Sequence, residues 1–175
     1  RFFVLHDAKT GKDIFIDARE IAPAAATQAA YLDAKGEFNR DRATNGAWSA
    51  GIPGLPAGLV HLASNHGRLP LKTSLAPAIR IAREGFPVYA RLANGYAARR
   101  EVMERYKGTK GVFLADGDAP EEGEILLQPD LARTLELLAE KGFDGFYRGP
   151  LAKTLLAGVK AEIGRWTADE LAAYR

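Results

Sequence analysis

An arginine followed by a glutamate is the residue pair with the clearest potential for chemistry. Arg19 and Glu20 follow the alternating, strand-like run IFIDA (residues 14–18) and precede Pro23, where an alanine-rich segment begins. A guanidinium group donates two parallel hydrogen bonds to a carboxylate, so an arginine at the end of a strand is well suited to bind a carboxylate ligand. The alternative is an internal ion pair between Arg19 and an acid elsewhere, and the residue types alone favour this ion pair.

The histidines, cysteines and serines indicate no second site. His61 and His66 lie five positions apart, not at the four-residue spacing that directs two helical ligands to one metal, and His6 lies in a strand-like run. We assign the histidines structural or surface roles and expect no metal site. The chain has no cysteine and no G-x-S-x-G motif, which excludes thiolate chemistry and the usual serine elbow.

The stretch GIPGLPAG (residues 51–58) has the glycine content of a nucleotide-binding loop without its context. Its glycine spacing differs, no hydrophobic strand leads into it, and Pro53 and Pro56 lack the main-chain N–H donors that a phosphate needs. We interpret it as a tight turn at which two backbone segments approach closely before a helix. No cofactor is expected.

The composition gives no reason to expect nucleic acid or a membrane as a partner. Lysine and arginine number 24 against 22 acidic residues, for a net charge of +2, and the basic residues are dispersed. No apolar run reaches the roughly 18–20 residues needed to cross a bilayer. A strand-like run starts beside Arg1 and a helical pattern continues to Arg175, so we expect a piece of a larger protein.

The pattern of elements predicts an α+β chain with an N-terminal β-hairpin followed by a mostly helical lobe. The β-prone runs at residues 2–6 and 14–18 flank a loop with Gly11, which predicts the hairpin. Turn-rich loops are expected at residues 36–54, and a short strand or turn at 111–128. Helices are expected at residues 24–32, 55–66, 88–106 and 129–141, and another through Leu75 and Ile79 ends at Gly85. Two further helices are expected to begin at Pro150 and at Thr167, and the spacing of Thr167 to Glu170 fits a capping box. We describe one incomplete domain, with residues 1–22 as the hairpin and residues 23–175 as the helical lobe.

Several motifs together resemble the gamma-glutamyltranspeptidase family, in the middle of its large subunit. They agree with the family in order and spacing over nearly the whole chain, which makes the likeness more specific than any one motif. The stretches are DAREIAPAAAT with YLD (residues 17–33), GIPGLPAGL (51–59), GRLPLKTSLAPAIRIAREGFPV (67–88), LLQPDLARTLELLAEKGFDGFYRGPLA (126–152) and TADELAAYR (167–175).

The resemblance implies an N-terminal-nucleophile hydrolase with a four-layer αββα core, made as a precursor that cleaves itself. The family's nucleophile is the threonine that begins the small subunit, and no threonine here has its context, so we expect no catalytic residue in this chain. Such an enzyme takes a γ-glutamyl group from glutathione or a related amide and passes it to water, an amino acid or a peptide. By this resemblance, Arg19 binds the α-carboxylate of the substrate and Glu20 supports it.

The resemblance also sets expectations for partners and location. The small subunit of the same precursor completes the enzyme, in the periplasm or outside the cell, and the fragment alone is expected to be inactive. Its open sheet edges favour self-association. Two alternatives stay open. One is a relative of the same fold that acts as a glutaryl or cephalosporin acylase or as a capsule depolymerase, and the other is a non-catalytic helical binding domain.

Overall fold

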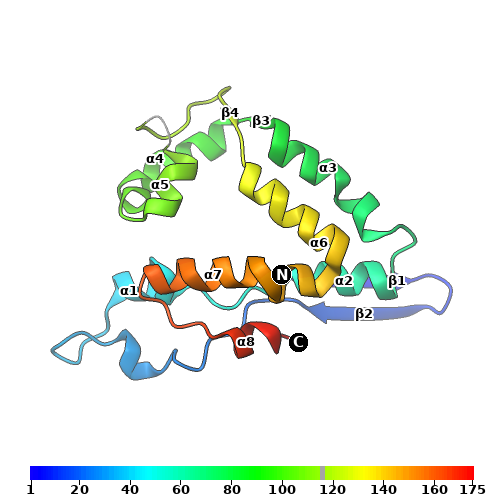
Figure 1. The fold of residues 1–175 in the computed structure, drawn as a ribbon, viewed down its shortest axis with the longest axis horizontal. Helices are drawn as coiled ribbons and strands as arrows, with labels where there is room; N and C mark the ends of the chain where they lie inside the picture. The colour runs from blue at the N-terminus through cyan, green and yellow to red at the C-terminus, as the bar shows by residue number, and fades with distance from the viewer. Residues whose placement is uncertain (115–116) are drawn as a thin grey trace. The chain divides into compact units, whose positions relative to one another are not determined.

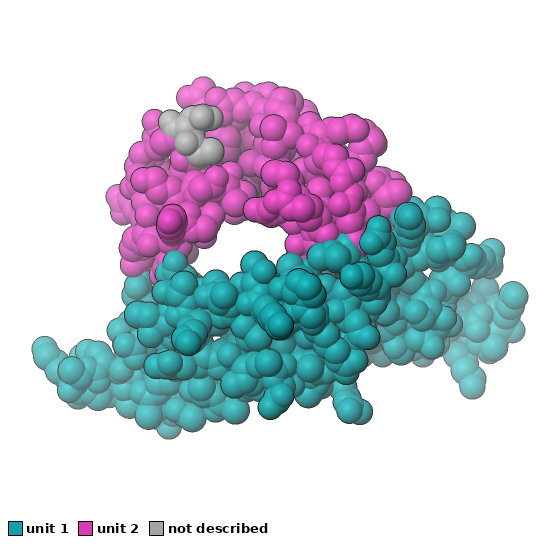
Figure 2. Space-filling view, in the orientation of Figure 1, with its two compact units in different colours: residues 1–74, 137–175 teal, residues 75–136 magenta. Residues whose placement is uncertain are grey.

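The computed structural model describes residues 1–114 and 117–175, and the chain divides into two compact units. Unit 1 comprises residues 1–74 and 137–175, and unit 2 comprises residues 75–136 (Figure 2). Helices α3 (Leu71–Glu84) and α6 (Pro129–Tyr147) have residues in both units. That residues 1–175 form one incomplete domain, made of residues 1–22 and 23–175, stays a prediction.

Unit 1 begins with the β-hairpin that the sequence predicts. Strands β1 (Phe2–Asp7) and β2 (Lys12–Asp17) pair antiparallel, in register along their whole length (Figure 1). The Asp7 carboxylate closes the turn by accepting a hydrogen bond from the Lys9 N–H at 3.0 Å. Gly11 adopts a φ of 68°, a left-handed conformation that glycine reaches without steric cost.

The rest of unit 1 is mostly helical, and its fully buried side chains include Tyr147 and Leu171. Tyr147 is 1% exposed and Leu171 is 0% exposed. The helices predicted at residues 55–66 and from Pro150 are confirmed, and both have proline in the first turn, where a missing N–H costs nothing. The elements that lie wholly within unit 1 are η1 (Gln28–Tyr31), α1 (Arg40–Thr44), η2 (Ala47–Ser49), α2 (Leu55–Asn65), α7 (Gly149–Ala161) and α8 (Ala168–Ala172).

Unit 2 is built from helices joined by a short two-stranded sheet. The sheet pairs β3 (Phe86–Pro87) with β4 (Ile125–Leu126) antiparallel. The α3 side chains that are buried in this unit include Leu75 and Ala82, as the apolar spacing predicts. The predicted end of this helix at Gly85 is confirmed. The short strand predicted within residues 111–128 forms at Ile125–Leu126, whereas residues 111–113 belong to a helix, and residues 115–116 of this stretch lie outside the described residues. The elements wholly within unit 2 are β3 (Phe86–Pro87), α4 (Ala90–Glu104), α5 (Lys107–Phe113) and β4 (Ile125–Leu126).

Two predictions about helices were wrong. Residues 24–32 were expected to be helical, but only the 3-10 turn η1 forms there. The Ala26 N–H donates to the Pro23 carbonyl at 2.8 Å and the Thr27 N–H donates to the Ala25 carbonyl at 2.9 Å, so short turns replace the start of the expected helix. The Ala24 N–H donates to the Glu170 carboxylate at 2.6 Å. Residues 36–54, expected to be loop, contain α1 and η2, because the Asn39 side chain accepts the Arg42 N–H at 2.9 Å and caps α1.

The end of α6 and the start of α8 follow the sequence signals closely. Gly142, the predicted stop, has a non-helical φ of 56° and separates the regular part of α6 from a final turn that reaches Tyr147. Thr167 and Glu170 form the predicted capping box, in which each side chain bonds to the main chain of the other residue. Local chemistry therefore sets both boundaries.

We expect Glu170→Gln to lower the thermal unfolding midpoint of the full-length protein at about pH 7, and to matter less at about pH 3. Hydrogen bonds from the Ala24 N–H and from Thr167 lower the pKa of Glu170. A carboxylate with a lowered folded-state pKa contributes stability that is present above its unfolded pKa of about 4.3 and is lost as the pH falls through the folded pKa. Melting curves of both proteins at the two pH values test this, with Asp169→Asn in the same turn as the control. A difference that does not change with pH contradicts it.

Candidate functional site

The main chain that follows β2 is held firmly by hydrogen bonds. Ala18 exchanges two main-chain hydrogen bonds with Arg1, at 2.8 and 2.9 Å. The Asp17 carboxylate accepts the Arg19 N–H at 2.9 Å, a local turn that ends the strand. Ile21 pairs antiparallel with Ile52 through bonds of 3.1 and 2.8 Å. The segment that carries Arg19 and Glu20 therefore has a defined backbone, although their side chains are exposed.

Three glycines of the GIPGLPAG stretch lie directly against this segment. A Cβ built on Gly54 would lie 2.1 Å from the Arg19 carbonyl oxygen, and one on Gly58 would lie 2.4 Å from the Ala18 Cβ. A Cβ on Gly51 would lie 2.9 Å from the Glu20 side chain. No larger residue fits at these distances without a shift of the backbone. The interpretation of this stretch as a close approach of two backbones before a helix is confirmed.

Two tyrosines join the glycine stretch and the arginine to the core of unit 1. The Tyr147 hydroxyl donates to the Pro53 carbonyl at 2.6 Å and accepts the Ala57 N–H at 3.2 Å, which satisfies an unpaired donor in the first turn of α2. The Tyr174 hydroxyl donates to the Arg19 carbonyl, and its ring stacks on Tyr147 with centroids 5.5 Å apart. Burial raises the pKa of both hydroxyls, so both keep their protons at neutral pH.

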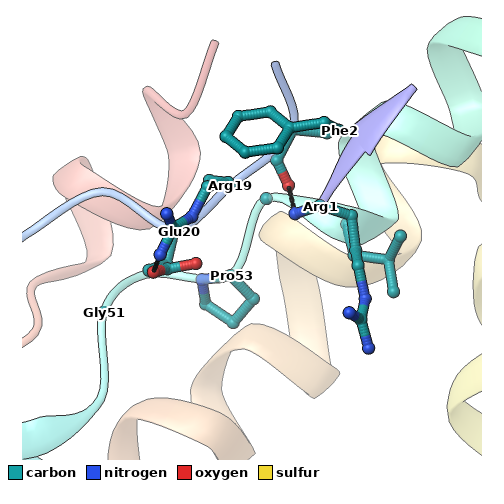
Figure 3. Close-up of a pocket in the computed structure, with 9 residues that line it drawn as sticks. Arg1, Phe2, Arg19, Glu20, Gly51 and Pro53 are labelled. Atoms are coloured by element: carbon teal, nitrogen blue, oxygen red, sulfur yellow. Dashed lines mark hydrogen bonds and ion pairs between the residues drawn. The ribbon is translucent and has the colours of Figure 1, made fainter. Parts of the chain in front are cut away.

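A pocket of about 710 Å³ opens where these segments meet, lined by residues 1, 2, 18–20, 51 and 53–55 (Figure 3). The Arg19 and Glu20 side chains are 54% and 50% exposed. The Arg19 guanidinium lies 5.7 Å from the centre of the Phe2 ring, while the Arg1 side chain extends away from the pair (Figure 3). Phe2, Pro53 and Leu55 give the pocket an apolar lining beside one ion pair.

The side chains of Arg19 and Glu20 bond to each other at the edge of this pocket. The Arg19 Nη2 donates to the Glu20 Oε1 at 2.6 Å. This hydrogen bond lowers the pKa of Glu20 and raises the pKa of Arg19, so both groups are charged at neutral pH. Within the described residues Glu20 is the one hydrogen-bond partner of the Arg19 side chain, which leaves other N–H groups of the guanidinium able to bind an anion.

The ion pair predicted as the alternative role of Arg19 is therefore present, but in an unexpected form. Its acid is the adjacent residue rather than a distant one, and the pair is exposed to the pocket instead of buried in the fold. An exposed pair of this kind adds little stability and can open for a ligand. Both readings of Arg19, as ion-pair partner and as anion-binding group, are compatible with one geometry.

The histidines lie away from this pocket. His6 bonds to Asp13 on the hairpin at 2.7 Å, and the rings of His61 and His66 have centroids 5.7 Å apart. Among residues 1–114 and 117–175, no group of three or more histidine, aspartate or glutamate side chains is arranged to hold a metal ion. Nor does any helix in those ranges have the length and apolar character needed to cross a bilayer.

Sequence reasoning missed the residues that support the site. Tyr147 and Tyr174 lie in stretches that resemble the family, but their residue types alone carry no sign of a hydrogen bond to Pro53 or to Arg19. The sequence did contain one signal, the glycines at positions 51, 54 and 58 of the turn-like GIPGLPAG stretch. Glycines in such a turn indicate that another segment of the chain packs closely against it.

Comparisons with known proteins identify one family over the whole chain. A family model described as gamma-glutamyltranspeptidase matches residues 1–175. The glutathione hydrolase proenzyme of Bacillus subtilis (strain 168) is 38% identical over 176 residues, which cover 99% of this chain and 30% of that protein. The chain thus spans about 30% of the length of such relatives.

Solved structures give the same result. The gamma-glutamyltranspeptidase of Helicobacter pylori is 32% identical with a TM-score of 0.95, covering all of this chain and 50% of that one. A cephalosporin acylase from Bacillus halodurans is 33% identical with a TM-score of 0.87, covering 99% of this chain and 33% of that one. The predicted α+β fold class is confirmed by these matches. With its motifs, its fold and its full-length match to the family model in agreement, this chain belongs to the gamma-glutamyltranspeptidase family.

Proposed function

We propose that the chain is the middle part of the large subunit of an enzyme that transfers or hydrolyses the γ-glutamyl group of glutathione and related amides. The observation that carries the proposal is an exposed arginine on a rigid backbone, at a pocket, within the stretch DAREIAPAAAT that resembles the family. The nucleophilic threonine, its α-amino base and the oxyanion hole belong to other parts of the precursor.

In this proposal Arg19 binds the α-carboxylate of the donor substrate. Its guanidinium keeps N–H groups available beyond the bond to Glu20, and a carboxylate accepts such donors in a paired geometry. Glu20 supports the site by holding the guanidinium at the edge of the pocket. The apolar lining by Phe2 and Leu55 suits the methylene groups between the α-carbon and the amide.

The proposal extends to the partner and the compartment. The exposed face of the hairpin carries Phe2, Val4 and Phe15, which are 54%, 76% and 62% exposed, so it suits coverage by further polypeptide. We assign this role to the small subunit, released when the precursor cleaves itself, and we assign the mature enzyme to the periplasm or the extracellular space. Self-association through the open hairpin edges stays a prediction.

A second candidate function is supported by the match to the cephalosporin acylase. A glutaryl group also presents a carboxylate at the end of a short apolar chain, so Arg19 could bind it in the same way. The two donors differ in the α-amino group, which glutaryl lacks.

We expect the full-length protein to release p-nitroaniline from γ-glutamyl-p-nitroanilide with a kcat/KM at least about tenfold above that for glutaryl-p-nitroanilide, because a site built to hydrogen-bond an amino group discriminates against a donor that lacks it. Steady-state kinetics with both donors measures the ratio. A preference for the glutaryl amide supports the acylase. Activity on neither donor, in a protein that has been shown by mass spectrometry to cleave itself, contradicts both assignments.

A further inference from the structure

We propose that Tyr174 is a positioning residue, which holds the main chain of Arg19 so that the guanidinium meets the carboxylate of the substrate. This inference rests on the proposed function, because it concerns the same pocket. Tyr174 does not line that pocket and acts through Arg19.

The hydroxyl of Tyr174 is supported by close packing. The side chain is 7% exposed, and its ring stacks on Tyr147, which is itself 1% exposed and bonded to Pro53 and Ala57. Phe143 stacks on the same ring of Tyr147, with centroids 4.3 Å apart. The hydroxyl that donates to Arg19 therefore cannot turn away without breaking a stack of aromatic rings.

Both the N–H and the carbonyl of Arg19 form hydrogen bonds with side chains rather than with a neighbouring strand. Asp17 accepts its N–H at 2.9 Å, and Tyr174 donates to its carbonyl. The Arg19 side chain is 54% exposed, and its guanidinium contacts Glu20 and the Phe2 ring, so these two main-chain bonds fix the point from which the side chain reaches the pocket. A binding group displaced by about 1 Å can cost about a hundredfold in rate, which makes the backbone position important.

The segment around α8 holds the Arg19 loop at two separate points. Glu170 accepts the Ala24 N–H, and Tyr174 donates to the Arg19 carbonyl, so one bond lies on each side of the sequence from Glu20 to Pro23. The capping box of Thr167 orders the helix between these two contacts. Burial raises the pKa of Tyr174, and the nearby Asp17 and Glu20 raise it further, so the hydroxyl remains a donor at neutral pH.

The test is a double-mutant cycle in the full-length enzyme, with γ-glutamyl-p-nitroanilide as the donor. Tyr174→Phe keeps the ring stack and removes one hydrogen bond, so we expect the KM to rise by about threefold to tenfold with little change in kcat. When Arg19→Ala is already present, Tyr174→Phe is expected to raise the KM no further, because the group it positions is gone. Tyr31→Phe is the matched control, since the Tyr31 hydroxyl also donates to a main-chain carbonyl, that of Trp48, at 3.0 Å.

The outcomes separate this inference from the function on which it rests. An unchanged KM in Tyr174→Phe, beside a raised KM in Arg19→Ala, overturns the positioning role alone. The same holds if the two substitutions raise the KM independently, or if Tyr31→Phe raises it as much as Tyr174→Phe. An unchanged KM in Arg19→Ala overturns both the positioning role and the proposed function.

Discussion

Replacement of Arg19 by alanine is expected to raise the KM of the full-length enzyme for γ-glutamyl-p-nitroanilide by about tenfold to a hundredfold, because a charge-assisted hydrogen bond to the donor carboxylate is lost. The guanidinium is exposed to the pocket and is charged at neutral pH, so it is available to a ligand. Arg19→Lys is expected to fall between the wild type and alanine, since lysine keeps the charge but not the paired donors. Initial-rate kinetics over a range of donor concentrations gives both constants.

Arg148 provides a closely matched control for this substitution. Its guanidinium also has one carboxylate partner, Asp144 at 2.7 Å, and also lies over an aromatic ring, Phe143 at 5.4 Å. Its side chain is 55% exposed, against 54% for Arg19, but it does not line the pocket. We expect Arg148→Ala to leave the KM unchanged. Equal effects of the two substitutions would show that loss of a surface arginine, rather than loss of a substrate contact, explains the result.

The second large effect is expected at Gly54, where alanine should destabilise the full-length protein by about 1–3 kcal/mol through overpacking. Its Cβ would lie 1.9 Å from the Tyr174 hydroxyl and 2.1 Å from the Arg19 carbonyl oxygen. The hydrogen bond between those two groups occupies the space that a side chain would need, so Gly54→Ala must displace one of them. We therefore expect a raised KM in addition to the lower stability. Calorimetry and steady-state kinetics on the same preparation measure both.

Gly158 is the natural comparison for Gly54. It lies in α7 of the same unit, and a Cβ there would meet nothing within 4 Å. Alanine restricts the unfolded chain and favours the helix, so Gly158→Ala is expected to stabilise the protein by about 0.5–1 kcal/mol and to leave the KM unchanged. If Gly54→Ala has the same small, favourable effect, the close approach to Arg19 does not constrain this position.

Local signals were enough to predict the parts of the fold that local chemistry determines. The hairpin around Gly11, helix α2 and the capping box at Thr167 all form as expected, since each depends on residues within a few positions. The helix predicted at residues 24–32 does not form, because the main-chain bonds of Ala26 and Thr27 close short turns and only the 3-10 helix η1 follows them. Helix α5 was not predicted, because two glycines in KGTKGVF lower its helix propensity, while Phe113 stacks on Tyr96 with centroids 5.2 Å apart.

The sequence indicated Arg19 and Glu20 as members of the candidate site, but not the residues that support them. Arg19 could be recognised from its residue type and from its place after a strand, and the resemblance to a family gave it a role that stays a prediction. The bond from Tyr174 spans 155 positions, and no periodicity or spacing indicates it. The identity of the ion-pair partner also required the structure, because an arginine next to a glutamate can pair with it or turn away from it.

In residues 17–21, different groups fix the backbone and face the pocket, which has a consequence for how such a protein could evolve to accept a new donor substrate. Main-chain pairing and a tyrosine hydroxyl maintain the shape of the segment, whereas the side chain at position 19 contributes little to it. Under the proposed role of Arg19 in donor binding, folding and ligand preference are nearly independent at this position. A single codon change there is then expected to alter the acyl group that is accepted while the scaffold persists, so selection can explore new chemistry without first passing through an unstable intermediate.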